Sequence, residues 1–166
     1  MYTDSGQDYQ INKRAGFSLI ELMVVVIIIA ITAAIAIPNM SGWFGKKTLD
    51  SISLQMFSDF QRARSEALTR DRTIKIDVHM NPDWYKVVYT TNGTDIDIVP
   101  QTNMPQGVDI QKTTFPLSVT ANTTWITPQG FANPGGYVTI YSNNAPLANR
   151  NKTITLSLGG AVSITP

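Results

Sequence analysis

The chain has 166 residues, which suits a membrane helix followed by one small globular domain. Its net charge of +1 provides no overall field that would attract nucleic acid. There is no cysteine and only one histidine, His79, so thiol nucleophiles, redox pairs and cysteine metal sites are excluded, and most zinc and triad chemistry with them. No catalytic group of residues stands out, and we therefore expect neither an enzyme nor a bound cofactor or metal.

The segment from Phe17 to Ile37 is almost entirely apolar. It is long enough to cross a bilayer core, which takes roughly 20 helical residues. Lys13 and Arg14 precede it, and the positive-inside rule keeps this end in the cytoplasm. The polar residues 1–16 are predicted to be a leader that is removed and takes no part in the fold.

Glu21 is the one charge in the apolar segment. A carboxylate inside a membrane helix costs a few kcal/mol, about 2–3 at least, so it normally has a partner. The segment supplies none. A cut after Gly16 would create an amino group at Phe17, and that group on a neighbouring copy of the chain is the nearest candidate.

Two simpler interpretations of the segment remain. A secretory signal would use Ala34-Ile35-Ala36 as its cleavage site, but such signals have shorter apolar regions. An uncleaved membrane anchor accounts for the apolar residues but leaves Glu21 without a role.

Pro38, Gly42 and Gly45 follow the apolar segment and weaken a helical backbone. Trp43 and Phe44 between them suit a membrane interface. The alternatives are a break between two helices and one long helix with a weakened segment. We favour one helix because helical periodicity resumes at once.

An apolar stripe with steps of three and four predicts an amphipathic helix that ends near residues 70–72. Its outer faces carry charges, among them Glu66 four residues before Arg70, a favourable helix pair. We expect the stripe to form the core against a sheet, with Phe60 at its centre. The stripe comprises Leu49, Ile52, Met56, Phe60, Ala63 and Ala67.

Beyond the helix the apolar period changes to two, which is typical of strands. Gly159-Gly160 predicts a tight hairpin turn, and Asp95-Ile96-Asp97 is interpreted as an edge strand rather than a calcium loop because further oxygen ligands are missing. One helix followed by short strands predicts an α+β fold with antiparallel sheets. The expected strands are 74–80, 84–90, 96–99, 108–112, one or two within 117–127, 137–142, 153–158 and 161–164.

Residues 16–21, Gly-Phe-Ser-Leu-Ile-Glu, resemble the type III signal of type IV pilins and type II secretion pseudopilins. The resemblance implies that a prepilin peptidase cuts between Gly16 and Phe17 and that Phe17 is then N-methylated. It assigns Glu21 and Pro38 to assembly with other pilin or pseudopilin subunits, through a helix that can soften around Pro38. It also implies a single-pass protein of the bacterial inner membrane with its head in the periplasm.

Three later segments resemble the GspH/FimT-type group of these pilins. They are Ala63-Arg64-Ser65-Glu66-Ala67, the segment from Trp125 through Pro128 and Gly130 to Phe131, and the final Gly159-Gly160 hairpin. The resemblance implies a minor pilin or pseudopilin near a fibre tip, with a long N-terminal helix packed on a β-sandwich-like head. The expected organisation is a leader at 1–16, a transmembrane and assembly helix at 17–45 and a soluble head at 46–166.

A binding role is the alternative function, in which the head recognises DNA or a secreted substrate. Some members of the group bind DNA through Gly-Arg-x-Arg in the terminal hairpin, but this chain has Gly160-Ala161-Val162-Ser163 there. That function cannot be carried over from the hairpin. Arg150 and Lys152 remain as candidate nucleic-acid contacts, although phosphate binding needs several clustered cations.

Overall fold

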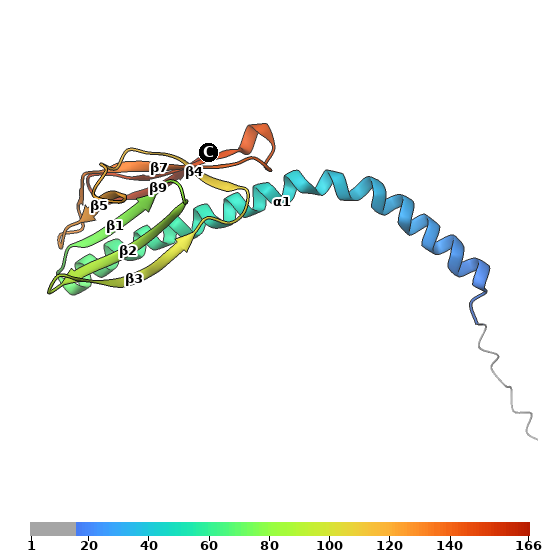
Figure 1. The fold of residues 1–166 in the computed structure, drawn as a ribbon, viewed down its shortest axis with the longest axis horizontal. Coiled ribbons are helices and arrows are strands. Elements are labelled where there is room, and N and C mark those ends of the chain that lie inside the picture. The colour runs from blue at the N-terminus through green and yellow to red at the C-terminus, as the bar shows by residue number, and fades with distance from the viewer. Residues whose placement is uncertain (1–15) are drawn as a thin grey trace, which may run out of the picture. The chain divides into compact units, whose positions relative to one another are not determined.

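The computed structural model describes residues 16–166, without the side chains of residues 37–39 and 41 (Figure 1). Apart from Gly16, the predicted leader therefore lies outside the described residues. The chain divides into two compact units, with the boundary between Pro38 and Asn39. Helix α1, Leu19–Arg70, contributes residues to both units.

The first unit contains the apolar part of α1. Leu19–Ala36 has a mean hydropathy of 2.9 and none of it is buried, so this segment is long and apolar enough to cross a membrane. Its polar side chain Thr32 donates a hydrogen bond to the carbonyl oxygens of Ile28 and Ile29, at 2.9 Å each. The hydroxyl is thereby satisfied within the helix, as an apolar environment requires. Of the two alternatives left by the sequence, residues 19–70 adopt one helix.

The second unit contains two antiparallel sheets. The first has the strand order β3-β2-β1-β5-β6, and the second has the order β4-β7-β8-β9. The bounds are β1 Ile74–His79, β2 Trp84–Thr91, β3 Thr94–Asn103, β4 Val108–Thr113, β5 Asn122–Ile126, β6 Ala132–Asn133, β7 Gly136–Ser142, β8 Asn151–Leu156 and β9 Val162–Thr165, with a short 3-10 helix η1 at Leu147–Asn149. Together with α1 they form the predicted α+β fold.

The core of this unit lies between the sheets and the second half of α1. Every residue of the predicted stripe is buried, and Phe60 is fully buried. The Phe60 ring packs edge-on against Tyr85, with 6.3 Å between centroids, and lies 6.5 Å from Phe115. Tyr85 donates a hydrogen bond to Asp59 at 2.6 Å. The pKa of the Tyr85 hydroxyl is raised, mainly by its burial and secondly by the nearby Asp59 carboxylate. The prediction of a core helix centred on Phe60 is confirmed.

The strand content of residues 117–127 was predicted correctly, whereas the extent of β3 was not. Residues 117–127 contain one strand, β5, in agreement with the one or two expected, and Leu117 and Val119 before it are 77% and 96% exposed. Their apolar side chains therefore have no sheet to pack on. Strand β3 is longer than predicted because it pairs along the whole of β2, through register shifts that periodicity does not reveal.

Candidate functional site

The predicted cleavage junction precedes the helix. Gly16, Phe17 and Ser18 lie outside α1, and Phe17 is 84% exposed. A side chain at Gly16 would meet no atom within 4 Å. The junction is thus open in this conformation, and its processing stays a prediction.

Glu21 lies in the first turn of α1, where a negative charge is favourable because the helix dipole is positive there. Its side chain is exposed, and it forms no hydrogen bond or ion pair within residues 16–166. Pro38 falls inside the bounds of the same helix. The assembly roles of Glu21 and Pro38 stay predictions.

The glycines after Pro38 have a packing role that the sequence did not indicate. The loop between β7 and β8 lies so close to Gly45 that a Cβ there would overlap the backbone of Asn144 and lie 2.7 Å from the Ala145 nitrogen. At Gly42 a Cβ would lie 3.7 Å from Pro146, an ordinary contact. The spacing of three between Gly42 and Gly45, about one helical turn, could have suggested a close approach of backbone.

The three segments that resemble the GspH/FimT group meet in space. Arg64 of α1 lies beside Gly130 and Gly160, each of which has a left-handed backbone, with φ of +79° and +73°. A Cβ at Gly160 would overlap the carbonyl oxygen of Gly130 and lie 3.1 Å from Arg64 Nε. The signature residues therefore hold the terminal hairpin, the 127–131 turn and the helix together.

The candidate nucleic-acid contacts, Arg150 and Lys152, both bind groups of their own chain. Arg150 Nε donates to the carbonyl oxygen of Ala145 at 3.0 Å, and its Nη1 donates to the Tyr141 hydroxyl at 3.4 Å. Lys152 pairs with Asp50 of α1 at 3.4 Å. Arg150 thus orders the loop between β7 and β8, and Lys152 ties β8 to the helix.

Arg70 at the end of α1 and Arg72 just beyond it also contact groups of their own chain. Arg70 forms the predicted ion pair with Glu66, whose carboxylate raises the pKa of Arg70. Arg72 donates a hydrogen bond to Thr91. Both guanidinium groups lie over the Tyr89 ring, at 5.6 and 5.8 Å from its centroid. The predicted Glu66–Arg70 pair is therefore present, and both arginines are held by groups of their own chain.

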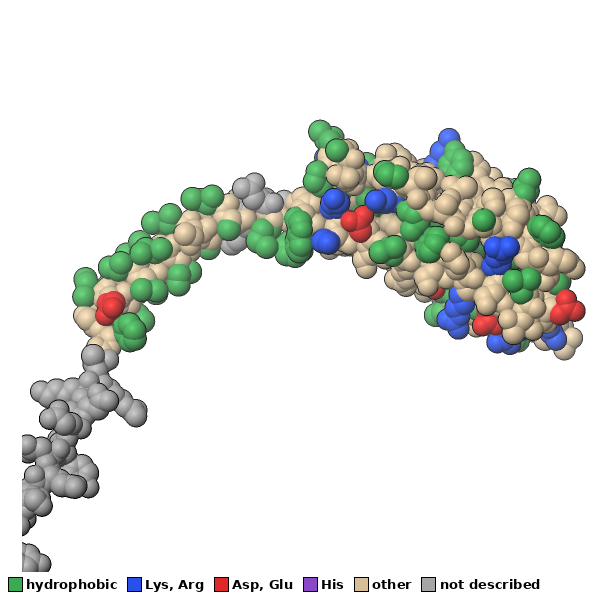
Figure 2. All heavy atoms as spheres, turned by 180° about the vertical axis from the view of Figure 1, so that it is seen from behind, with side chains coloured by type: hydrophobic (Ala, Val, Ile, Leu, Met, Phe, Trp, Pro, Cys, Tyr) green, Lys and Arg blue, Asp and Glu red, His purple; other side chains and the backbone are tan. Residues whose placement is uncertain are grey.

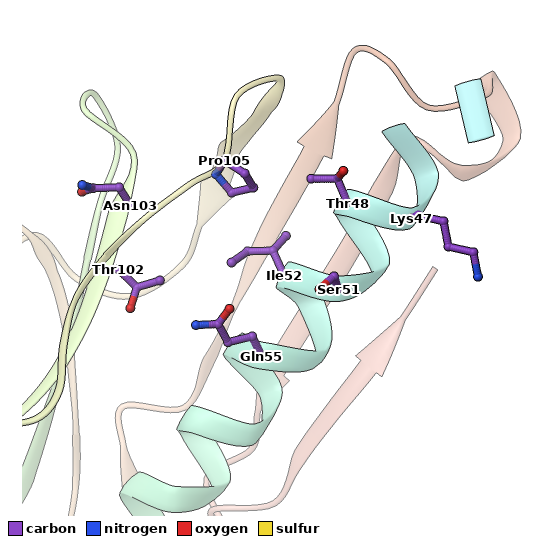
Figure 3. A pocket seen from close by; sticks show the side chains of 8 residues that line it. All are labelled: Lys47, Thr48, Ser51, Ile52, Gln55, Thr102, Asn103 and Pro105. Carbon is purple, nitrogen blue, oxygen red and sulfur yellow. The ribbon is translucent and has the colours of Figure 1, made fainter. Parts of the chain in front are cut away.

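An open groove of about 480 Å³ lies between α1 and the end of β3 (Figure 3). Ile52 and Gln55 line the helix side, and Thr102 and Pro105 line the other, whereas Lys47 points away from it. Neither a nucleophile with its base nor a pair of carboxylates lines this groove. Within the described part of the chain no three His, Asp or Glu side chains are grouped to hold a metal ion.

Comparison with known proteins identifies the family and the fold. The family model of the type II transport protein GspH matches residues 54–160, and that of the prokaryotic N-terminal methylation motif matches residues 11–37. No curated protein matches the chain.

Two solved structures share the fold at low sequence identity. The minor pseudopilin EpsH from the type 2 secretion system of Vibrio cholerae aligns with a TM-score of 0.58 and 10% identity, over 70% of this chain and 95% of that one. The type IV minor pilin FimU of Pseudomonas aeruginosa aligns with a TM-score of 0.55 and 16% identity, over 71% and 88%. The GspH match covers more than half of the chain, so this protein belongs to the GspH family of minor pilins and pseudopilins.

Proposed function

We propose that the protein is a structural subunit that assembles through its N-terminal helix into a type IV pilus or a type II secretion pseudopilus, near the tip. Before assembly it is anchored in the inner membrane with residues 46–166 in the periplasm, and residues 17–45 form the anchor and assembly helix. The observation that carries this proposal is Leu19–Ala36, an unburied apolar helix with Glu21 in its first turn.

Glu21 is the proposed docking charge. After cleavage Phe17 carries an amino group that is charged near neutral pH, even when methylated. An ion pair between this group and Glu21 satisfies two charges that lipid would leave bare. The two groups lie about one turn apart in a single helix, so pairing within one chain competes with pairing between chains. We propose that pairing between neighbouring subunits fixes their axial register.

A nucleic-acid role gains no support from the contacts. Arg150 and Lys152 are each bound to groups of their own chain, and the terminal hairpin carries no arginine. Specific phosphate binding needs several cations free to converge on one path. We therefore propose assembly as the function.

The test replaces Glu21 with alanine and uses Leu22→Ala in the same turn as the control. Glu21→Ala makes the segment more apolar, so membrane insertion and cleavage should be unchanged while incorporation into the fibre falls strongly. Leu22→Ala removes an exposed apolar side chain without changing charge. Intact mass of membrane-extracted protein reports cleavage before Phe17 and methylation, and crosslinking to partner pilins reports incorporation.

Two outcomes would contradict the proposal. Cleavage after Ala36, with Ile37 as the new terminus, would identify a secretory signal instead. Normal assembly of Glu21→Ala, at the level of Leu22→Ala and wild type, would remove Glu21 as the docking charge.

A further inference from the structure

The loop between β7 and β8 presents an apolar residue beside the start of the second unit. Its backbone lies against Gly45 of α1, and its Pro146 lies against Gly42. The next residue, Leu147 of η1, is 83% exposed. The neighbouring helix residues Trp43 and Phe44 are 53% and 54% exposed, with their rings edge-to-face at 5.1 Å.

Positive charge gathers at the same place. Lys47 lies with its ammonium 5.7 Å from the centroid of the Trp43 ring. A depression of about 310 Å³ is lined by Lys47 and Lys152, with Asp50 as its only carboxylate. Figure 2 shows basic side chains around one acidic side chain where α1 enters the head, with apolar side chains beside them. The amphiphilic cluster comprises Trp43, Phe44, Lys46, Lys47, Leu147 and Lys152.

The amphiphilic cluster follows the membrane-spanning segment closely along the chain. Trp43 comes seven residues after Ala36, the last residue of the apolar window. Seven helical residues rise about 10 Å. The headgroup region adds roughly 5–8 Å to each side of the hydrocarbon core. Along the chain, Trp43 and Phe44 are therefore the residues of the cluster that lie nearest to the headgroup region.

We propose that the amphiphilic cluster binds the anionic phospholipid surface of the membrane from which the head emerges. Tryptophan and other apolar side chains enter the interfacial region, and lysines attract anionic headgroups. Lys152 is paired with Asp50, so Lys46 and Lys47 give the cluster the net positive charge that such a surface requires. The contact holds the unassembled head against the membrane, and the head must release it when the subunit is drawn into a fibre.

The proposal rests on the membrane anchoring in the proposed function but not on assembly. Its failure would leave the Glu21 experiment untouched, and a failure of the Glu21 experiment would leave this contact untouched. The chain contains no cysteine, so a single introduced cysteine gives a unique fluorescent label. Ala148 is exposed beside Leu147, whereas Leu158, 70% exposed, lies beyond the opposite end of β8 from Lys152.

The experiment reconstitutes the full chain, labelled at Ala148→Cys or at Leu158→Cys, in vesicles. The vesicles contain phosphatidylcholine alone or with about a third phosphatidylglycerol, and acrylamide quenching reports the exposure of the label. We expect quenching at position 148 to fall at least about twofold in the anionic vesicles and to recover in high salt, with no change at position 158. Equal quenching at position 148 in the two lipids would overturn the proposal.

A matched pair of variants separates the amphiphilic cluster from net charge. Lys46→Gln with Lys47→Gln should abolish the lipid-dependent protection at position 148. Arg62→Gln with Lys112→Gln removes the same charge at exposed positions elsewhere in the head and should leave the protection intact. Equal loss of protection in both double variants would mean that overall charge is responsible, and would also overturn the proposal.

Discussion

Gly160 illustrates how a single backbone conformation holds the head together. Its φ of +73° is one that residues with a Cβ rarely adopt, and its Cα faces the carbonyl oxygen of Gly130. Arg64 covers the two turns from the helix side, with its Nε buried and without a hydrogen-bond partner among the described residues. Arg64 therefore acts here through the packing of its side chain as well as through its charge.

Alanine substitutions at the neighbouring glycines Gly159 and Gly160 should have very different effects on stability. Gly160→Ala strains a left-handed residue and forces the two turns apart, so it should lower the free energy of unfolding by at least about 2 kcal/mol. At Gly159 a Cβ would meet only Ser157 Oγ, at 3.9 Å. Gly159→Ala should stay within about 0.5 kcal/mol of wild type. Denaturant unfolding measures both, and equal stability of the two variants would show that the turns are not interlocked.

The sequence identified these residues as signature positions but not as neighbours. Arg64, Gly130 and Gly160 were singled out separately, by resemblance, at spacings of more than 20 residues. Which turns meet depends on how the sheets fold back on α1, and that is a tertiary property. The residue types were predictable because left-handed turns favour glycine, whereas the contact between the turns was not.

The second half of α1 shows what periodicity can predict at the scale of an element. Its buried stripe was found from spacing alone, because one helical face must lie against the core. Phe60→Ala should cost roughly 3–5 kcal/mol, since the ring is fully buried between Tyr85 and Phe115. Leu54→Ala on the same helix is the control, because Leu54 is 60% exposed and should change stability by less than about 0.5 kcal/mol. Similar unfolding midpoints for the two variants would contradict this core.

Strand β3 shows where periodicity stops being informative. It lies at the edge of its sheet, as predicted for Asp95-Ile96-Asp97, and it contains Pro100, a residue that sheets tolerate mainly in edge strands. The pKa of Asp95 is lowered, mainly because the Thr90 hydroxyl donates a hydrogen bond to its carboxylate. The Lys75 ammonium, 2.9 Å from the same carboxylate, lowers it further. Its residues beyond Val99 showed no alternation and were not predicted as strand, because their pairing with β2 follows register shifts.

At the scale of the whole molecule, the N-terminal segment was the most predictable part. Length, apolarity and one unpaired carboxylate restrict residues 17–37 to very few interpretations. The start of the head was harder to place, because Gly42 and Gly45 contact residues of the β7–β8 loop that lie far away in the sequence, Asn144, Ala145 and Pro146. Those contacts lie on the anchor side of the boundary predicted at residue 46, within the compact unit that begins at Asn39.

Two soluble fragments should therefore differ in stability. A fragment of residues 39–166 retains the packing of Gly42 and Gly45 against the loop, whereas a fragment of residues 46–166 exposes Asn144 and Ala145. We expect both to unfold cooperatively, because both keep the buried stripe from Leu49 to Ala67. The shorter fragment should melt several degrees lower, the shift that about 1–2 kcal/mol produces in a domain of this size.

Two substitutions in the longer fragment test whether the glycine contact is the cause. Gly45→Ala should lower its Tm toward that of the shorter fragment, because a Cβ there overlaps the Asn144 backbone. Gly42→Ala should have little effect, since its Cβ would make an ordinary contact with Pro146. Calorimetry of the two fragments and the two variants measures these Tm values. If the two fragments and both variants melt together, the head begins at residue 46 and the helix turn before it contributes nothing to its stability.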